Sequence, residues 1–225
     1  AFTPEPIKSK SPVEKQIASY SENQIMFVHK KKARQSKIYY YSKGMNYSTD
    51  QQASMNAFNA YFGGGFSGLV LQEVREYRSL AYSAGANYSS PMLAGNPCSF
   101  VGYIGTQADK TTEGLEVFNG LVRDMPNKPE RLEMIKDYLI LSNSAAQPSF
   151  RNMSETVLMW KHKGYTADPS IMLLKAYQTL DYNTISEFYL KNIKSQKMTI
   201  AIVGNKKNIN MDLLASYGKI VMIKE

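Results

Sequence analysis

A long run of helical periodicity separates strand-like segments at the two ends of this chain, and this order constrains the fold most. A chain with strands at both ends and helices between them predicts one α+β domain, in which the helices pack on one face of a mostly antiparallel sheet. Apolar spacing, prolines and glycines predict helices at 109–125, 129–145, 150–162, 168–178 and 181–193.

The strand-like segments lie before and after this run of helices. Because Pro91, Gly95 and Pro97 mark the connection between two of them, the segments 80–89 and 98–106 are expected to form an antiparallel pair. Strands are predicted at 24–30, 37–43, 80–89, 98–106, 197–203 and 219–223, and further helices at 50–62, 67–77 and 209–216.

The length of 225 residues suits one large domain, whose core buries roughly 70 to 75% of the surface of the unfolded chain. Residues 1–22 contain three prolines among serines, lysines and glutamates, so we expect a linker or strap from a preceding domain. Residues 23–225 then form the folded domain. The chain starts without a methionine or a signal-peptide pattern, so we expect it to be a piece of a longer protein.

Cysteine content and hydropathy leave the compartment open. The single cysteine, Cys98, excludes an internal disulfide, and no apolar run approaches the roughly 18 residues that cross a bilayer. We therefore expect a soluble chain without a transmembrane segment. Both the bacterial periplasm and the cytoplasm are compatible with these features.

The net charge of +8 raises the question of a nucleic-acid partner. The segment KKKAR at 30–34 lies close in sequence to Tyr39, Tyr40 and Tyr41, and basic groups beside aromatic rings are typical of phosphate-binding surfaces. The alternative is a solvated strand edge that lysines protect against aggregation. We prefer the alternative because the sequence contains no nucleic-acid-binding motif, and we predict no nucleic-acid partner.

The segment YFGGGFSGLVLQEVREYRSLAY, at 61–82, is rich in glycine. Gly63, Gly65 and Gly68 fit the pattern G-x-G-x-x-G, which binds nucleotides when it follows a strand. Here the preceding segment has helical periodicity, which argues against a nucleotide. We therefore predict a tight turn between two helices, with the left-handed backbone angles that glycine adopts readily.

Arg75 and Tyr82 lie seven residues apart, at the end of a predicted helix and the start of a predicted strand. A guanidinium and a phenol both donate hydrogen bonds, and donors aimed at a carbonyl stabilise the oxyanion of amide hydrolysis. Alternatively, Arg75 and Arg78 interact with the helix C-terminus or pair with Glu73 and Glu76. The residues alone leave both interpretations open.

The histidines argue against a zinc site in this chain. A zinc site needs at least three converging nitrogen, sulfur or carboxylate ligands. The only two histidines, His29 and His162, are far apart in sequence, and neither belongs to a ligand pattern. We predict no metal site.

Several segments together resemble one family. GGGFSG, LVLQEVRE and RSLAYS are similar to segments of the insulinase and pitrilysin family of zinc peptidases, which includes the mitochondrial processing peptidases. PERLEMIKDYLI, DYNTISEFYLKNI and KMTIAIVGN follow in the family's order, so the resemblance covers about residues 24–223 and is to the C-terminal, non-metal-binding domains. It implies a processing-peptidase-like fold, with helices on one side of a mostly antiparallel sheet.

The resemblance also implies a parent zinc peptidase in which two or four such domains enclose an extended peptide in a clamshell. The family's catalytic domains carry H-x-x-E-H on the helix that corresponds to residues 51–61, where this chain reads QQASMNAFNAY without a zinc ligand. The resemblance therefore implies a domain with no cofactor of its own, inactive alone, whose partner domain or subunit, in cis or in trans, supplies zinc.

By the same resemblance, Arg75 and Tyr82 match an arginine and a tyrosine that reach the substrate from the family's non-catalytic half. Arg75 is expected to hold a peptide carbonyl or carboxylate, and Tyr82 to donate to the tetrahedral intermediate. Arg78 is the alternate arginine. The alternative is a scaffolding domain that keeps the fold without any peptidase role. The loop expected to line the cavity consists of Gly63, Gly64 and Gly65.

Overall fold

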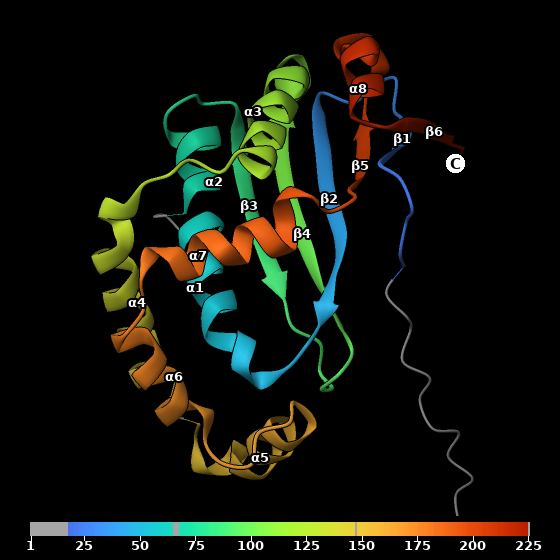
Figure 1. The fold of residues 1–225 in the computed structure, drawn as a ribbon. Helices are drawn as coiled ribbons and strands as arrows, with labels where there is room; N and C mark the ends of the chain where they lie inside the picture. The colour runs from blue at the N-terminus through green and yellow to red at the C-terminus, as the bar shows by residue number, and fades with distance from the viewer. Residues whose placement is uncertain (1–17, 65–67, 147, 225) are drawn as a thin grey trace, which may run out of the picture.

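The computed structural model describes residues 18–64, 68–146 and 148–224. In this part of the chain, six strands form one mixed sheet in the order β3-β4-β2-β5-β1-β6, and helices such as α1, α3 and α7 cross one of its faces (Figure 1). The strands are β1 (Gln24–His29), β2 (Gln35–Asn46), β3 (Ala81–Ser89), β4 (Pro97–Gln107), β5 (Thr199–Gly204) and β6 (Lys219–Ile223).

The directions of the strands confirm the predicted α+β class with a mostly antiparallel sheet. The central strand β2 pairs antiparallel with β4 and with β5, and β3 pairs antiparallel with β4 as the sequence predicts. β1 pairs in parallel with both β5 and β6. Parallel strands need a crossover connection, and helix α8 (Met211–Tyr217) lies in the one between β5 and β6.

The helices lie within a few residues of their predicted bounds. Three of them begin at residues whose side chains accept a hydrogen bond from a backbone N–H of the first turn, namely Asp168, Asp181 and Asn210. The helices are α1 (Gln52–Phe62), α2 (Leu69–Leu71), α3 (Thr111–Arg123), α4 (Leu132–Ala145), α5 (Met153–His162), α6 (Pro169–Gln178), α7 (Tyr182–Tyr189) and α8, with π-helical segments η3 (Gln72–Glu76) and η7 (Leu190–Lys194) and short 3-10 turns η1 (Thr49–Gln51), η4 (Ala108–Lys110), η5 (Pro129–Arg131), η6 (Phe150–Asn152) and η8 (Lys206–Asn208).

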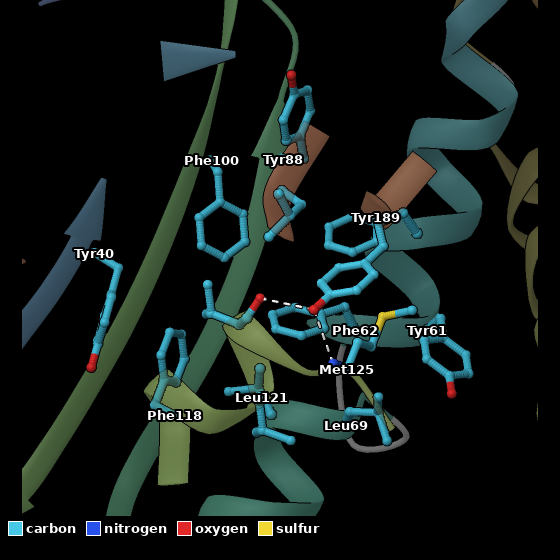
Figure 2. Packing of buried hydrophobic residues seen from close by; sticks show 14 of the residues in the cluster. Tyr40, Tyr61, Phe62, Leu69, Tyr88, Phe100, Phe118, Leu121, Met125 and Tyr189 are labelled. Atoms are coloured by element: carbon cyan, nitrogen blue, oxygen red, sulfur yellow. Dashed lines mark hydrogen bonds between the residues drawn. The ribbon is translucent and has the colours of Figure 1, made fainter. Parts of the chain in front are cut away.

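Alternation along β2 divides the sheet into a buried face and a helix-free face. Ile38 and Tyr40 are fully buried, whereas Tyr39 between them is 45% exposed. Tyr40 stacks on Phe118 of α3 with ring centroids 4.4 Å apart, in the aromatic core that Figure 2 shows between the sheet and the helices. The helices therefore cover one face only.

Buried polar groups join the helices to one another and to the sheet. The Tyr189 hydroxyl donates to the Val122 carbonyl oxygen and accepts from the Met125 backbone N–H, each over 3.1 Å (Figure 2). The Asn59 side chain of α1 accepts from the Tyr88 backbone N–H over 2.7 Å and donates to the Tyr88 carbonyl oxygen over 2.9 Å. These bonds fix α1 against β3, which carries part of the candidate site.

The basic segment and the three tyrosines do not form the stacking surface considered above. Residues 30–34 form the turn between β1 and β2, so they lie neither on a strand nor on a sheet edge as our preferred interpretation assumed. Tyr40 points into the core, and the Tyr41 hydroxyl donates to the Ala18 carbonyl oxygen over 2.7 Å. Consecutive residues of a strand face opposite sides, so three adjacent tyrosines cannot share one face.

Candidate functional site

Arg75 lies in a helical segment that widens from α2 into the π-helical segment η3. The helix predicted for 67–77 begins at Leu69, with Gly68 at the N-cap. In η3 the Tyr77 backbone N–H donates to the Gln72 carbonyl oxygen, five residues earlier, over 2.9 Å. Such π-helical turns are rare and frequently occur at functional sites. The widened turn carries Arg75 one residue before the helical segment ends.

The end of η3 reverses the chain toward the sheet. Ser79 has a φ of 51°, a left-handed angle that serine adopts only when its surroundings hold it there. Its backbone N–H donates to the Arg75 carbonyl oxygen over 2.9 Å, and the Leu80 N–H donates to the Val74 carbonyl oxygen over 3.0 Å. These nested bonds resemble the usual closure of a helix at a left-handed residue. They bring the start of β3 back beside Arg75.

Tyr82 occupies a bulge at the start of β3. Ala81 pairs with Thr106 of β4 and Ser83 pairs with Gly105, so Tyr82 is an extra residue without a partner of its own in the ladder. The bulge directs the ring onto the helix-free face, where a Cβ atom built on Gly105 would lie 2.7 Å from the Tyr82 hydroxyl oxygen. Tyr82 is 48% exposed.

The structure brings Arg75 and Tyr82 to one pocket of about 510 Å³. Gln35 and Gln107, which pair across β2 and β4, also line it. Sequence reasoning missed both glutamines, because nothing in the sequence indicates that these two strand ends meet beside Arg75. With the Ser79 hydroxyl, the pocket presents several neutral hydrogen-bonding groups around one guanidinium. The residues that line it are Gln35, Arg75, Glu76, Ser79, Leu80, Ala81, Tyr82 and Gln107.

The charges distinguish Arg75 from Arg78. Arg75 Nε lies 3.5 Å from Glu76 Oε1, and both side chains are about half exposed, so this pair contributes little. Arg78 is already engaged, since its Nη1 donates to the Glu73 carbonyl oxygen over 2.9 Å and pairs with the Glu73 carboxylate. Burial raises the pKa of Glu73, but hydrogen bonds from Arg78 and Lys128 outweigh this effect and hold the pKa below its usual value. Arg78 does not line the pocket.

Tyr82 keeps its proton at neutral pH. A hydrogen bond with Tyr103, together with weaker effects of burial and of neighbouring tyrosines, raises the pKa of Tyr82 above its usual value of 10. The phenol is therefore neutral and able to donate. A guanidinium and a phenol at one pocket form a pair of donors that suits a carbonyl or carboxylate oxygen.

The glycine turn differs from its prediction. Gly63 has a φ of −116°, and Gly64 is not left-handed either, so unrestricted backbone angles do not explain the first two glycines. The reason is close approach: a Cβ atom on Gly63 would lie 1.8 Å from the Ala86 carbonyl oxygen of β3. Gly64 borders a cavity of about 390 Å³ between α1, α4, α6 and β3, which is separate from the Arg75 and Tyr82 pocket, so the role of the glycine loop in a substrate chamber stays a prediction. Gly65 lies outside the described residues.

We expect Gly63→Ala to lower the free energy of unfolding by about 1 to 3 kcal/mol, because the new methyl group collides with backbone that cannot rotate away. Gly85→Ala is the matched control, since no atom lies within 4 Å of a Cβ built there, and its effect should stay within about 0.5 kcal/mol. Urea unfolding followed by circular dichroism measures both. Equal effects of the two substitutions would contradict the close-approach explanation.

The histidines do not meet. His29, at the end of β1, accepts a hydrogen bond at Nδ1 from the Lys206 backbone N–H over 3.3 Å, whereas the carbonyl oxygen of His162, at the end of α5, accepts from the Ala94 N–H. Within residues 18–64, 68–146 and 148–224, no three His, Cys, Asp or Glu side chains gather as metal ligands. Across the same ranges no helix is long and apolar enough to span a bilayer.

Fold and pocket together define an α+β domain whose candidate site carries a guanidinium and a phenol as hydrogen-bond donors. A family profile described as "Peptidase M16 inactive domain" matches residues 4–139, which is more than half of the chain. The chain belongs to this family and is a C-terminal domain of the insulinase type, as the resemblance implied.

Relatives agree with this assignment. The non-peptidase homolog YmxG of Helicobacter pylori is 23% identical over 150 residues, which are 64% of this chain and 34% of that protein. The crystal structure of a peptidase M16 inactive domain from Pseudomonas fluorescens is similar in fold, with a TM-score of 0.69 and 18% identity over 88% of this chain and 48% of that one. The periplasmic protease PqqL of Escherichia coli gives a TM-score of 0.65 and 13% identity, over 88% of this chain and 22% of PqqL. The chain therefore spans less than half the length of these relatives.

Proposed function

We propose that this domain binds an extended peptide at the Arg75 and Tyr82 pocket and closes the clamshell chamber of a zinc metallopeptidase. The observation that carries the proposal is that a guanidinium and a neutral phenol, from elements that meet only after folding, line the same pocket. Its amide and hydroxyl neighbours suit a peptide backbone, which offers both N–H and carbonyl groups. Arg75 holds a carbonyl or carboxylate, and Tyr82 donates to the oxygen that becomes negative in the tetrahedral intermediate.

A partner domain or subunit that carries H-x-x-E-H supplies the zinc and the water in this proposal. By the family resemblance, α1 corresponds to the metal-binding helix of the catalytic domains. Its side chains make structural contacts: the Asn56 amide donates to the Tyr177 hydroxyl over 2.6 Å, and the Asn59 side chain bonds the Tyr88 backbone of β3. The domain alone is therefore inactive. Because PqqL is a periplasmic protease, we propose the periplasm as the compartment of this domain. No nucleic acid takes part.

The scaffolding alternative rests on one observation, the description of YmxG as a non-peptidase homolog. A scaffolding domain keeps the sheet and the helices without using the pocket. It predicts that no substitution at Arg75 or Tyr82 changes the affinity for a peptide.

We expect Arg75→Ala to weaken peptide binding by about tenfold or more, because a hydrogen bond to a charged group contributes about 1.5 to 3 kcal/mol. The probe is a fluorescein-labelled tryptic digest of denatured casein, and the readout is fluorescence anisotropy with the 225-residue chain. Arg151→Ala is the matched control, since Arg151 lies over the Phe150 ring and far from the pocket in sequence. Equal affinities of the wild type and Arg75→Ala would favour the scaffolding alternative.

A further inference from the structure

Three tyrosines form a row across the helix-free face of the sheet. Tyr39 of β2 pairs with Tyr103 of β4, and their ring centroids lie 5.0 Å apart. Tyr82 of β3 follows on the other side of Tyr103. A Cβ atom built on Gly105 would lie 2.7 Å from the hydroxyl oxygens of both Tyr82 and Tyr103, so these two hydroxyl groups meet above Gly105. Only Tyr82 of the three lines the Arg75 pocket.

Local backbone features create this meeting. The bulge turns Tyr82 onto the same face as Tyr103. In a regular strand Tyr82 would share the face of Ala84, two residues later, which packs against the core. Gly105 has no side chain, so the Tyr82 ring can lie across β4. The bulge and Gly105 together therefore determine where the Tyr82 phenol lies at the edge of the pocket.

We infer that Tyr103 is a positioning residue for Tyr82, and that its hydroxyl fixes the Tyr82 phenol above Gly105 and supplies the hydrogen bond that lets Tyr82 donate to a peptide carbonyl. This inference rests on the proposed function. Tyr103 itself does not contact the peptide; it acts through Tyr82, which does.

The protons of the two phenols decide how Tyr103 supports Tyr82. Each phenol carries one proton and can accept further hydrogen bonds. The Tyr82 and Tyr103 hydroxyls share one hydrogen bond, in which either oxygen can be the donor, and this bond raises the pKa of Tyr82 because it favours the neutral phenol. When a carbonyl enters the pocket, the Tyr82 proton turns to it, and Tyr103 turns its own proton to the Tyr82 oxygen. No covalent bond changes, and the second hydrogen bond polarises the first.

Tyr103→Phe tests the contact directly. We expect the pKa of Tyr82 to fall toward 10 in this variant, because the hydrogen bond with Tyr103 that raises this pKa is gone. The measurement is an NMR titration of the 225-residue chain labelled with ζ-¹³C tyrosine, in which Tyr82→Phe identifies the Tyr82 signal. Tyr138→Phe, an exposed tyrosine of α4, is the control and should leave that pKa unchanged. An unchanged pKa in Tyr103→Phe overturns the inference.

Peptide affinity separates positioning from independent binding. With the casein digest as probe, we expect Tyr103→Phe and Tyr82→Phe each to weaken binding about fivefold, as for one neutral hydrogen bond. The double variant should be no weaker than Tyr82→Phe alone, because Tyr103 acts only through Tyr82. Additive losses overturn the positioning role. If Arg75→Ala and Tyr82→Phe leave the affinity unchanged, the proposed function fails and takes the inference with it; if only Tyr103→Phe has no effect, the inference alone fails.

Discussion

Replacing Phe118 with alanine is expected to lower the free energy of unfolding by about 3 to 5 kcal/mol, the usual cost of removing a buried aromatic ring. Phe118 has no exposed surface and stacks on Tyr40. Its ring also fills the space above Gly102 of β4, where a Cβ atom would lie 2.4 Å from the ring. Two strands, β2 and β4, contact this side chain of α3, so the cavity left by alanine cannot close without moving α3 or the sheet.

Phe150→Ala is the matched control for this prediction. The chemical change is the same, but Phe150 is 82% exposed and its loss should change the free energy of unfolding by less than about 0.5 kcal/mol. Guanidinium chloride unfolding followed by tryptophan fluorescence measures both variants. A loss of less than about 1 kcal/mol for Phe118→Ala would show that the packing of α3 on β2 and β4 contributes little to stability.

The same packing holds the candidate site. β2 and β4 carry Gln35 and Gln107 at the pocket, and β4 carries Tyr103 and Gly105 under the Tyr82 ring. Tyr82 belongs to β3, which pairs with β4, and Arg75 belongs to η3, which contacts β3. A substitution that loosens the core is therefore expected to weaken peptide binding even though the substituted residue does not line the pocket. Measuring the stability of each variant at the site separates this indirect effect from a direct one.

The periodicity of the sequence predicts the helices and strands well because one face of the sheet is covered by helices and the other is exposed. β2 alternates between buried and exposed residues, which is the signature of a strand with one covered face. Local residues also mark the starts of helices between 111 and 194, such as the N-caps Asp168 of α6 and Asp181 of α7. Local signals of this kind need no knowledge of the rest of the chain.

The parallel side of the sheet and the pocket depend on contacts between distant residues, and for that reason the sequence does not reveal them. Periodicity identifies β1, β5 and β6 as strands but is silent about which strand lies beside which. The bulge at Tyr82 and the pairing of Gln35 with Gln107 likewise depend on register between strands. Sequence alone therefore places Arg75 and Tyr82 near each other along the chain, while the pocket around them requires the fold.

The glycines show a second limit. A glycine pattern indicates that a side chain is not tolerated, but the cause is either a left-handed angle or a close approach of another backbone. At Gly63 the neighbour is Ala86, 23 residues later in the sequence, and only the fold shows it. Among the described residues of this region, the left-handed φ angle belongs instead to Ser79, and a serine in the sequence does not indicate a left-handed φ.

The proposed function predicts that Arg75→Ala lowers kcat/KM for peptide cleavage about 100-fold, the size of effect that follows the loss of one donor to a developing oxyanion. The assay combines the domain with the H-x-x-E-H domain or subunit that completes the enzyme and follows cleavage of a quenched fluorescent peptide. Arg78→Ala tests the alternate arginine and should have a much smaller effect, since Arg78 is held by Glu73 away from the pocket. Arg151→Ala serves as the neutral control.

The division of this loss between kcat and KM identifies the step at which each residue acts. A residue that binds the peptide equally in the ground state and in the transition state raises KM and leaves kcat unchanged, whereas a donor to the tetrahedral intermediate lowers kcat. Arg75 is expected to affect both constants, because a guanidinium holds the carbonyl before and during attack. Tyr82→Phe should lower mainly kcat, since the variant lacks the phenol that donates to the oxygen when this oxygen gains charge. Unchanged kcat/KM in both variants would exclude Arg75 and Tyr82 from the reaction and leave this domain a scaffold.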